Sequence, residues 1–298
     1  EIAERELLLI VTPEPEEVKK QIAAIVNMEN VRFLECGTND TWARDHGAIT
    51  MMDADGPSLL DFTFNGWGLK FASHLDNQIT RHAVENGILK GRYVNRLGFV
   101  LEGGSIESDG MGTLLTTSEC LLSPNRNGQK NKVEIEEYLK SVFQVRQILW
   151  LDDGYLAGDD TDSHIDTLAR FCPADTIVYV QCEDETDEHY EALQAMEEQL
   201  HSFRTLNGEP YRLLALPMAD KIVEEGERLP ATYANFLILN GTILYPTYNQ
   251  PENDRRACEV LQEAFPGYQM VGIDCRPLIK QHGSLHCVTM QYPLGVLK

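Results

Sequence analysis

Basic residues are scarce in this sequence. Its 298 residues include 25 Lys and Arg against 47 Asp and Glu, which gives a formal net charge of −22 and a sequence pI near 4.7. Nucleic-acid binding needs a basic surface to neutralise phosphates, and an anionic membrane surface needs the same kind of charge. The composition therefore argues against both partners and favours a cationic small molecule, which a cleft lined with carboxylates attracts.

Long apolar runs and cysteine motifs are also missing. No stretch approaches the roughly 20 apolar residues of a transmembrane helix, and residues 1–6 are too charged for a signal peptide. The seven cysteines are odd in number and show no C-x-x-C spacing, so neither a disulfide framework nor a zinc ribbon is indicated. We expect reduced cysteines and a cytoplasmic location.

The composition is that of a folded protein. Hydrophobic residues make up 43% of the chain, and a chain of this length buries roughly three quarters of its unfolded surface. No linker or low-complexity tract interrupts it, so we expect a single domain over residues 1–298. A homodimer is the general expectation for soluble oligomers.

Helix-like and strand-like segments alternate along the chain. Apolar residues at helical spacing predict helices over 15–27, 76–89, 131–142, 187–203 and 252–265. Short β-rich runs come between and after these helices; they cover 31–36, 48–53, 59–64, 98–104, 112–117, 145–151, 164–171, 176–182, 211–218, 234–240, 242–248, 268–275 and 285–291. Asn240-Gly241, between two of the runs, is a strong hairpin signal.

The pattern predicts an α/β fold in which one helix plus about three strands recur five times. The units are about 55 to 65 residues long and share almost no sequence identity. An ordinary α/β domain also alternates strands and helices, so the pattern alone leaves both architectures open.

Five segments place glycine or turn residues together with acid, histidine or cysteine beside a β-rich run. They are 38–47, 101–110, 158–166, 247–253 and 281–287. Four of them supply a reactive group from a similar slot of the repeat: Asp45, Glu102, His164 with Asp166, and Cys287. If the units surround an axis, these groups meet at its centre. Taken singly, each also has a structural explanation, such as a small buried thiol.

Cys287 is the candidate nucleophile. In the strand expected over 285–291, His286 points to the opposite face, so the activating base should come from elsewhere. His164 is the better candidate for this base. On an extended segment His164 and Asp166 share a face and can address one ligand.

A thiol, an imidazole and several carboxylates suit a guanidinium substrate. This cation is planar and presents five N–H donors, which carboxylates bind in pairs. Its carbon is a poor electrophile, so the reaction needs a strong nucleophile and an acid for the departing ammonia. Cys287 and His164 fit these two roles. Asp45 and Asp166 would fix the guanidinium, and Glu102 would orient His164 or bind a further N–H.

Four segments resemble the bacterial agmatine deiminase and Porphyromonas-type peptidylarginine deiminase family of the guanidine-modifying, or pentein, superfamily. They are NDTWARDHG (39–47), LEGGSIESDGMGTLLTTSECLLSPNRN (101–127), GDDTDSHIDTLARF (158–171) and GSLHCVTMQ (283–291). They spread over most of the chain and are very specific together. The resemblance implies a five-bladed α/β propeller of ββαβ-type repeats around a central active site. It also implies hydrolysis without a cofactor or metal.

The resemblance also assigns residues. It implies a catalytic set made of Asp45, Glu102, His164, Asp166 and Cys287, and it matches Trp42 to a wall of the substrate site, where a flat ring can face a planar cation. The other expected substrate-binding residues are Asp40, Gly104, Asp160 and Asn249. An amine at the far end of the substrate would be received by Asp160, Asp162 or Glu107.

Three features depart from the family pattern. Its usual N-terminal stretch, with W-x-x-H and W-P, is absent before Glu1, so we expect a further N-terminal segment. The Gly-Pro that usually follows the aspartate of W-x-R-D reads Gly47-Ala48, and the usual Gly before the H-x-D histidine is Ser163. None of these departures removes a reactive group.

The expected reaction is hydrolysis of agmatine to N-carbamoylputrescine and ammonia through a covalent thiouronium on Cys287, as in putrescine and polyamine metabolism. Deimination of free or peptidyl arginine is the alternative. Another Cys–His hydrolase, a non-catalytic guanidino-ligand binder and a metal site remain rivals. His282 and His286 are four apart, but Gly283 stands where a zincin has Glu. The acids between Asp152 and Asp162 lack the EF-hand pattern.

Overall fold

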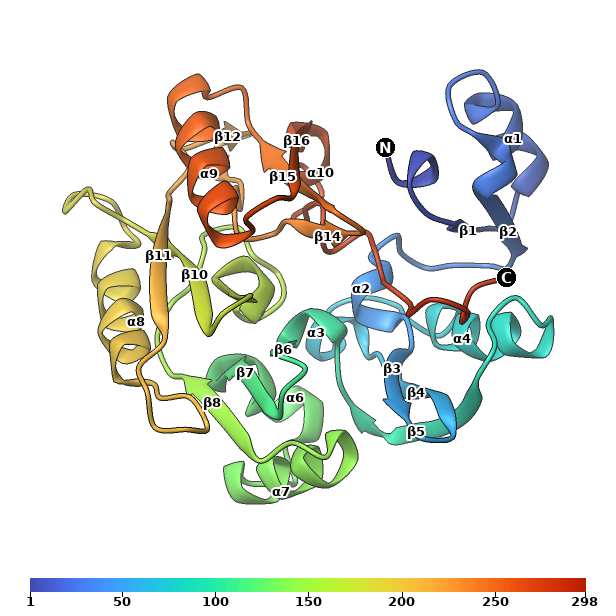
Figure 1. Cartoon of the computed structure of the whole chain (residues 1–298), viewed down its shortest axis with the longest axis horizontal. Helices are drawn as coiled ribbons and strands as arrows, with labels where there is room; N and C mark the ends of the chain where they lie inside the picture. Colours follow the sequence, from blue (N-terminus) through green and yellow to red (C-terminus); the bar gives the residue numbers. More distant parts are fainter. The chain divides into compact units, whose positions relative to one another are not determined.

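The computed structural model describes residues 1–298 and divides into two compact units. The first unit comprises residues 1–103 and 289–298, and the second comprises residues 104–288. Each is a mixed α/β arrangement of small sheets (Figure 1). None of the helices has both the length and the apolar character that a membrane span requires.

One supersecondary pattern recurs in both units. Two antiparallel strands are followed by a helix and by a third strand that pairs in parallel with the second. A parallel neighbour needs a crossover connection, and the helix supplies it. The pattern builds four three-stranded sheets, ordered β3-β4-β5, β6-β7-β8, β9-β10-β11 and β14-β15-β16, and none of them closes on itself.

The first unit contains one of these sheets and a shorter β1-β2 pair joined by a helix. Its elements are η1 (Ile2–Glu4), β1 (Leu8–Thr12), α1 (Pro15–Ile22), η2 (Met28–Asn30), β2 (Val31–Glu35), α2 (Ala43–His46), β3 (Ile49–Asp53), β4 (Gly56–Thr63), α3 (Gly66–Leu69), α4 (Asp76–Glu85) and β5 (Arg92–Val100). The short helix η3 (Gly103–Ser105) spans the boundary between the units.

The second unit contains the other three sheets and a two-stranded hairpin, β12-β13. Its elements are β6 (Ile106–Ser108), β7 (Thr113–Thr117), α5 (Ser118–Leu121), α6 (Pro124–Asn127), α7 (Lys132–Phe143), β8 (Gln147–Leu151), η4 (Ile165–Thr167), β9 (Ala169–Cys172), β10 (Thr176–Gln181), α8 (Tyr190–Ser202), β11 (Arg212–Pro217), β12 (Val223–Glu224), β13 (Glu227–Arg228), β14 (Leu237–Leu239), β15 (Thr242–Thr247), α9 (Pro251–Ala264), β16 (Gln269–Asp274) and α10 (Arg276–Ile279).

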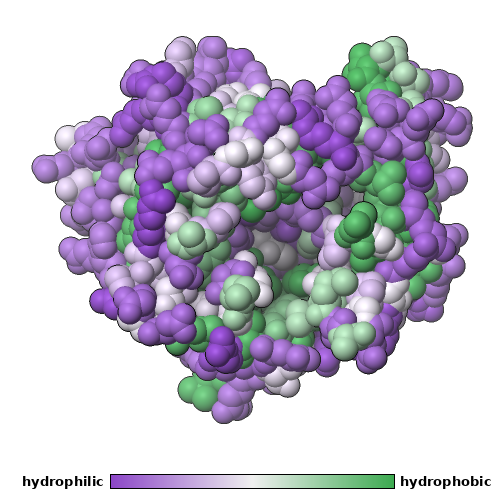
Figure 2. Space-filling view, in the orientation of Figure 1, coloured by the Kyte–Doolittle hydropathy of each residue, from purple (hydrophilic) through white to green (hydrophobic).

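The middle strand of each three-stranded sheet is buried on both faces. In β10, for example, residues 176–180 are all buried, and β7 is buried along its whole length. A strand covered on both faces carries a continuous apolar run rather than an alternating one. Figure 1 shows α8 alongside β10 and β11, where it covers one face. Figure 2 shows a largely hydrophilic surface with scattered apolar patches, which suits the acidic composition.

Most predicted helices and strands are confirmed, including a helix and three strands in each complete repeat. The helix lies between the second and third strands, however, rather than ahead of all three. The Asn240-Gly241 turn is confirmed, because Leu239 pairs with Thr242 across it. The strand predicted over 98–104 lies earlier in the chain, because β5 begins at Arg92 and ends at Val100.

One predicted strand is wrong and another is wrong over its first half, and both carry candidate site residues. The segment 164–171 starts with the 3-10 helix η4, and only its end enters β9. The segment 285–291 forms no strand, because residues 285–288 make a turn. Local side-chain and main-chain hydrogen bonds override the strand pattern in both places.

His46, at the end of α2, is buried in the first unit without a polar partner. It is 8% exposed, and no protein group makes a hydrogen bond with either ring nitrogen. Its ring lies 5.9 Å from that of Phe64. Burial disfavours the imidazolium, so the pKa of His46 falls to about 4. The side chain is therefore neutral in the folded protein at neutral pH.

We expect His46 to reduce stability in acid. The unfolded chain binds a proton at this histidine below about pH 6.5, whereas the folded chain binds it only near pH 4. Its contribution, present above pH 6.5, is therefore lost as the pH falls through that window, by up to about 3 kcal/mol. Urea midpoints at pH 7 and pH 4.5 should differ less in His46→Phe than in the wild type. The exposed His201→Gln control should retain the wild-type difference, and an unchanged difference in His46→Phe would refute the expectation.

Candidate active site

Cys287 lies in a turn that a buried asparagine holds in place. Asn235 is fully buried, and its side-chain oxygen accepts hydrogen bonds from the main-chain N–H groups of His286 at 2.9 Å and Cys287 at 3.3 Å. The same oxygen lies 3.4 Å from Cys287 Sγ. A side chain thus replaces the strand partner that the sequence predicted for this segment. The amide fixes both the main chain and the thiol.

Asp166 is the carboxylate beside this thiol. Its Oδ2 lies 4.0 Å from Cys287 Sγ and accepts a hydrogen bond from His286 Nδ1 at 2.7 Å. Asp166 is fully buried, and His286 is 4% exposed. The expectation that His286 points away from the site is therefore wrong, because its premise was a strand. In the turn, His286 and Cys287 both reach one carboxylate oxygen.

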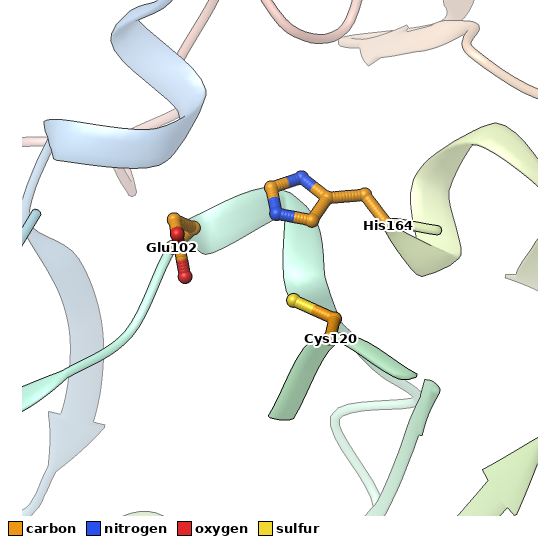
Figure 3. A group of neighbouring side chains, drawn as sticks. All are labelled: Glu102, Cys120 and His164. Atoms are coloured by element: carbon orange, nitrogen blue, oxygen red, sulfur yellow. The ribbon is translucent and has the colours of Figure 1, made fainter. Parts of the chain in front are cut away.

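His164 precedes Asp166 at the start of η4. The 3-10 turn is closed by Thr167, whose main-chain N–H and hydroxyl donate to the His164 carbonyl at 3.1 and 2.7 Å. The prediction that His164 and Asp166 lie on an extended segment and share its face is therefore wrong, because Asp166 lies in η4. His164 is 1% exposed, and one of its ring nitrogens lies within 4.8 Å of Cys120 Sγ. Figure 3 shows the Cys120 thiol pointing toward the His164 ring.

The loop before His164 is held in an unusual backbone conformation. Asp162 and Ser163 both adopt left-handed values, with φ of 63° and 60°. Ser163 stands where the resemblance expects glycine, and its hydroxyl donates to Glu119 at 2.8 Å. Arg126, whose side chain is fully buried, donates to Asp162 at 2.6 Å. A serine by itself disfavours the left-handed conformation, so these contacts hold the loop in a strained state.

Asp45 and Trp42 belong to the first unit. Asp45 is 3% exposed and accepts a hydrogen bond from the Trp67 indole at 2.9 Å. Trp42 is buried at the N-terminus of α2. Asp40 lies nearby in sequence, and burial and the Asp76 carboxylate raise its pKa. Trp67 was not singled out from the sequence, because no spacing links it to Asp45.

Glu102 is fully buried next to a glycine that the packing requires. A Cβ on Gly103 would lie 2.2 Å from the carbonyl oxygen of Arg44, far inside van der Waals contact. Glu102, labelled in Figure 3, is the last residue but one of the stretch 1–103 of the first unit. Gly104, also buried, opens the second unit.

The residues expected at the far end of the substrate are differently placed. Glu107 binds Arg170 at 2.9 Å and Asp162 binds Arg126, so both carboxylates already face a cation. Asp160 Oδ2 lies 3.6 Å from His282 Nδ1. Asn249 is exposed and has a φ of 58°. We call the turn at residues 285–288, which contains Cys287, the cysteine turn. No contact described for Asn249 joins it to this turn.

The residues proposed as a rival metal site have structural partners. His282 Nδ1 donates to the Gly158 carbonyl at 2.6 Å, and His286 binds Asp166. Asp159 accepts hydrogen bonds from Thr161 and Ser163 and so shapes the loop before His164. Within the second unit, Cys120 and His164 offer one sulfur and one nitrogen ligand.

Comparison with known proteins gives consistent results along the whole chain. A family model described as Porphyromonas-type peptidyl-arginine deiminase matches residues 1–293. A protein of Marinomonas sp. named as a candidate agmatine deiminase is 34% identical over 285 residues, which cover 89% of this chain and 77% of that protein.

Solved structures agree with this match. A candidate arginine deiminase from Porphyromonas gingivalis has 51% identity and a TM-score of 0.95, over 100% of this chain and 88% of that one. An agmatine deiminase of C. jejuni with substrate bound has 42% identity and a TM-score of 0.88, over 96% of this chain and 82% of that one. An amidinotransferase from Microseira wollei, at 11% identity and a TM-score of 0.53 over 96% and 81%, shares the fold alone.

We expect Ser163→Gly to be more stable than Ser163→Ala by about 1 kcal/mol, because a left-handed residue with a Cβ is strained by about 1 to 2 kcal/mol. Both variants lose the hydrogen bond to Glu119, so their difference isolates the backbone. At an ordinary position alanine is the more stable residue of the two. Thermal unfolding of the two variants measures the difference, and an alanine variant at least as stable as the glycine one would show that the loop is unstrained.

Proposed function

The chain belongs to the Porphyromonas-type peptidyl-arginine deiminase family, and from this premise we propose that it hydrolyses agmatine to N-carbamoylputrescine and ammonia. The observation that carries the proposal is the buried group around Cys287, in which a thiol lies 4.0 Å from the Asp166 carboxylate. A carboxylate beside a nucleophile suits a cationic electrophile. A neutral amide carbonyl would instead require donors for a developing oxyanion.

The substrate assignment rests on charge and on relatives. Agmatine carries a guanidinium and an ammonium, and a chain with a net charge of −22 attracts both ends. The C. jejuni structure at 42% identity is an agmatine deiminase with its substrate. Free arginine would in addition need a cationic partner for its carboxylate. In the second unit, the buried Arg126 and Arg170 already bind Asp162 and Glu107.

The reaction takes two stages. The Cys287 thiolate adds to the guanidinium carbon, the C–N bond to one amino group breaks, and His164 gives its proton to the departing ammonia. This leaves a thiouronium on Cys287. His164 then takes a proton from water, the resulting hydroxide adds to the same carbon, and the C–S bond breaks to release the thiolate. The hydroxyl proton of the intermediate passes to the solvent, where it converts ammonia to ammonium, and the neutral ureido product leaves. Atoms and charges balance with water as the only co-reactant, and His164 acts first as acid and then as base.

The remaining candidates have binding roles in this proposal. Asp166 and Asp45 each accept hydrogen bonds from two guanidinium N–H groups. Carboxylates commonly bind a guanidinium through two parallel hydrogen bonds of this kind. Trp67 keeps Asp45 oriented through its indole hydrogen bond. Trp42 provides a flat wall, and Glu102 orients His164 or binds a further N–H. The five-bladed propeller belongs to the same proposal, supported by the four ββαβ sheets and the shorter β1-β2 pair.

We expect Cys287→Ala to abolish ammonia release from agmatine, by at least about 1000-fold, because no other group supplies the covalent step. The matched control is Cys258→Ser in α9, which should retain wild-type turnover. The assay offers agmatine, free arginine and an internal peptidyl-arginine separately, with EDTA present, and identifies the product by mass.

Turnover by Cys287→Ala at the control rate would reject the covalent mechanism. Ammonia from arginine or the peptide, but not from agmatine, would retain the mechanism and replace the substrate. Binding of agmatine by the wild type without ammonia release would identify a guanidino-ligand binder instead.

A further inference from the structure

Arg170 is a buried cation that lies behind the cysteine turn. It is 2% exposed, and its Nε donates to Glu107 at 2.9 Å. Its Nη1 donates to the carbonyls of Ala234 and Phe236 at 3.2 and 2.8 Å, and its guanidinium carbon lies 4.6 Å from the centre of the Phe236 ring. These contacts bind one face of the guanidinium and most of its N–H groups.

The remaining nitrogen of Arg170 determines the tautomer of His286. Arg170 Nη2 lies 3.2 Å from His286 Nε2. A guanidinium only donates hydrogen bonds, so Nε2 must be the acceptor and carry no proton. The imidazole proton therefore lies on Nδ1, which faces Asp166 Oδ2 at 2.7 Å. Protonation of Nε2 would bring two N–H donors face to face in a buried site, so His286 stays neutral.

The four side chains form a directed chain of hydrogen bonds. Glu107 and Arg170 cancel each other's charge, His286 is neutral, and Asp166 keeps one negative charge next to Cys287. The oxygen that His286 binds is also the oxygen nearest the thiol. A buried carboxylate without such a donor would be costly and free to rotate.

From this geometry we infer that His286, held by Arg170, is a positioning residue that keeps Asp166 in the orientation in which it binds the substrate guanidinium. The inference rests on the proposed function, because it assigns Asp166 to the guanidinium. His286 itself touches neither the substrate nor the reacting atoms in this account. Its effect on the reaction passes through Asp166.

Two amide variants separate the two hydrogen bonds of His286. In His286→Asn the amide nitrogen can occupy the place of Nδ1 and donate to Asp166, whereas in His286→Gln the longer side chain reaches toward Arg170 and the donor to Asp166 is lost. We expect His286→Gln to lose about 10- to 100-fold in kcat/KM with agmatine, as for a hydrogen bond to a charged group. His286→Asn should remain within about 5-fold of the wild type on the same scale.

The distribution of the loss between KM and kcat distinguishes positioning from a structural role. Asp166 binds the guanidinium before and during the reaction, so the His286→Gln loss should appear mainly as a higher KM. A merely destabilised fold would lower kcat in both variants and leave KM unchanged. That pattern, or equal losses in the two variants, would overturn the inference.

A readout independent of turnover uses the wild-type protein with ¹⁵N-labelled histidine. The His286 signals, assigned by their loss in His286→Asn, should show a protonated Nδ1 and an unprotonated Nε2 from pH 6 to pH 8. An imidazolium or a proton on Nε2 would overturn the inference. A wild-type protein that shows this tautomer but turns over none of the three guanidino substrates would reject the proposed function, while the hydrogen-bonded chain stands.

Discussion

A single buried guanidinium determines how the second unit is assembled. Arg170 lies on β9, and its partners lie on β6, on the segment that leads into β14, and in the cysteine turn. Removing a cation from water costs several kcal/mol unless its donors are satisfied. Arg170 can therefore be buried only when parts of three different sheets and the turn are all in place. The position of the thiol follows from that requirement.

Side chains, rather than a sheet, hold the reactive groups. Asn235 accepts from the main-chain N–H groups of His286 and Cys287, and Arg126 and Glu119 hold the loop that precedes His164. Irregular backbone of this kind leaves polar groups that must find partners when buried. Here the partners come from distant segments, so the reactive residues are fixed by tertiary contacts. Loops held on a rigid scaffold are the usual place for catalytic residues.

The sequence predicts the parts of this protein that depend on local patterns. Continuous apolar runs identify β10 and β15, and Asn240-Gly241 identifies the turn between β14 and β15. The composition and the four motif segments are enough to point to a guanidino substrate and to Cys287, His164 and Asp166. These inferences rest on residue chemistry, on short spacing and on the family resemblance that the four segments carry.

The supporting residues could not be predicted because they act over long separations. Asn235 precedes Cys287 by 52 positions in the chain, and Glu107 precedes Arg170 by 63. Within segment 285–291 the apolar pattern favours a strand, but the amide of Asn235 satisfies the main chain in a turn instead. The role of His286 could not be predicted either, because it depends on Arg170. Arg170 lies within the H-x-D motif segment, but no periodicity singles out this residue.

The central claim is that the Cys287 thiol forms a covalent bond to the substrate carbon. The most direct measurement is rapid acid quenching of the wild-type protein during turnover of agmatine, followed by peptide mapping by mass spectrometry. The account predicts a thiouronium adduct on the peptide that contains Cys287, which appears and decays with turnover. An adduct on Cys120, whose thiol lies within 4.8 Å of a His164 ring nitrogen, or turnover that leaves all seven thiols unmodified at every quench time, would contradict it.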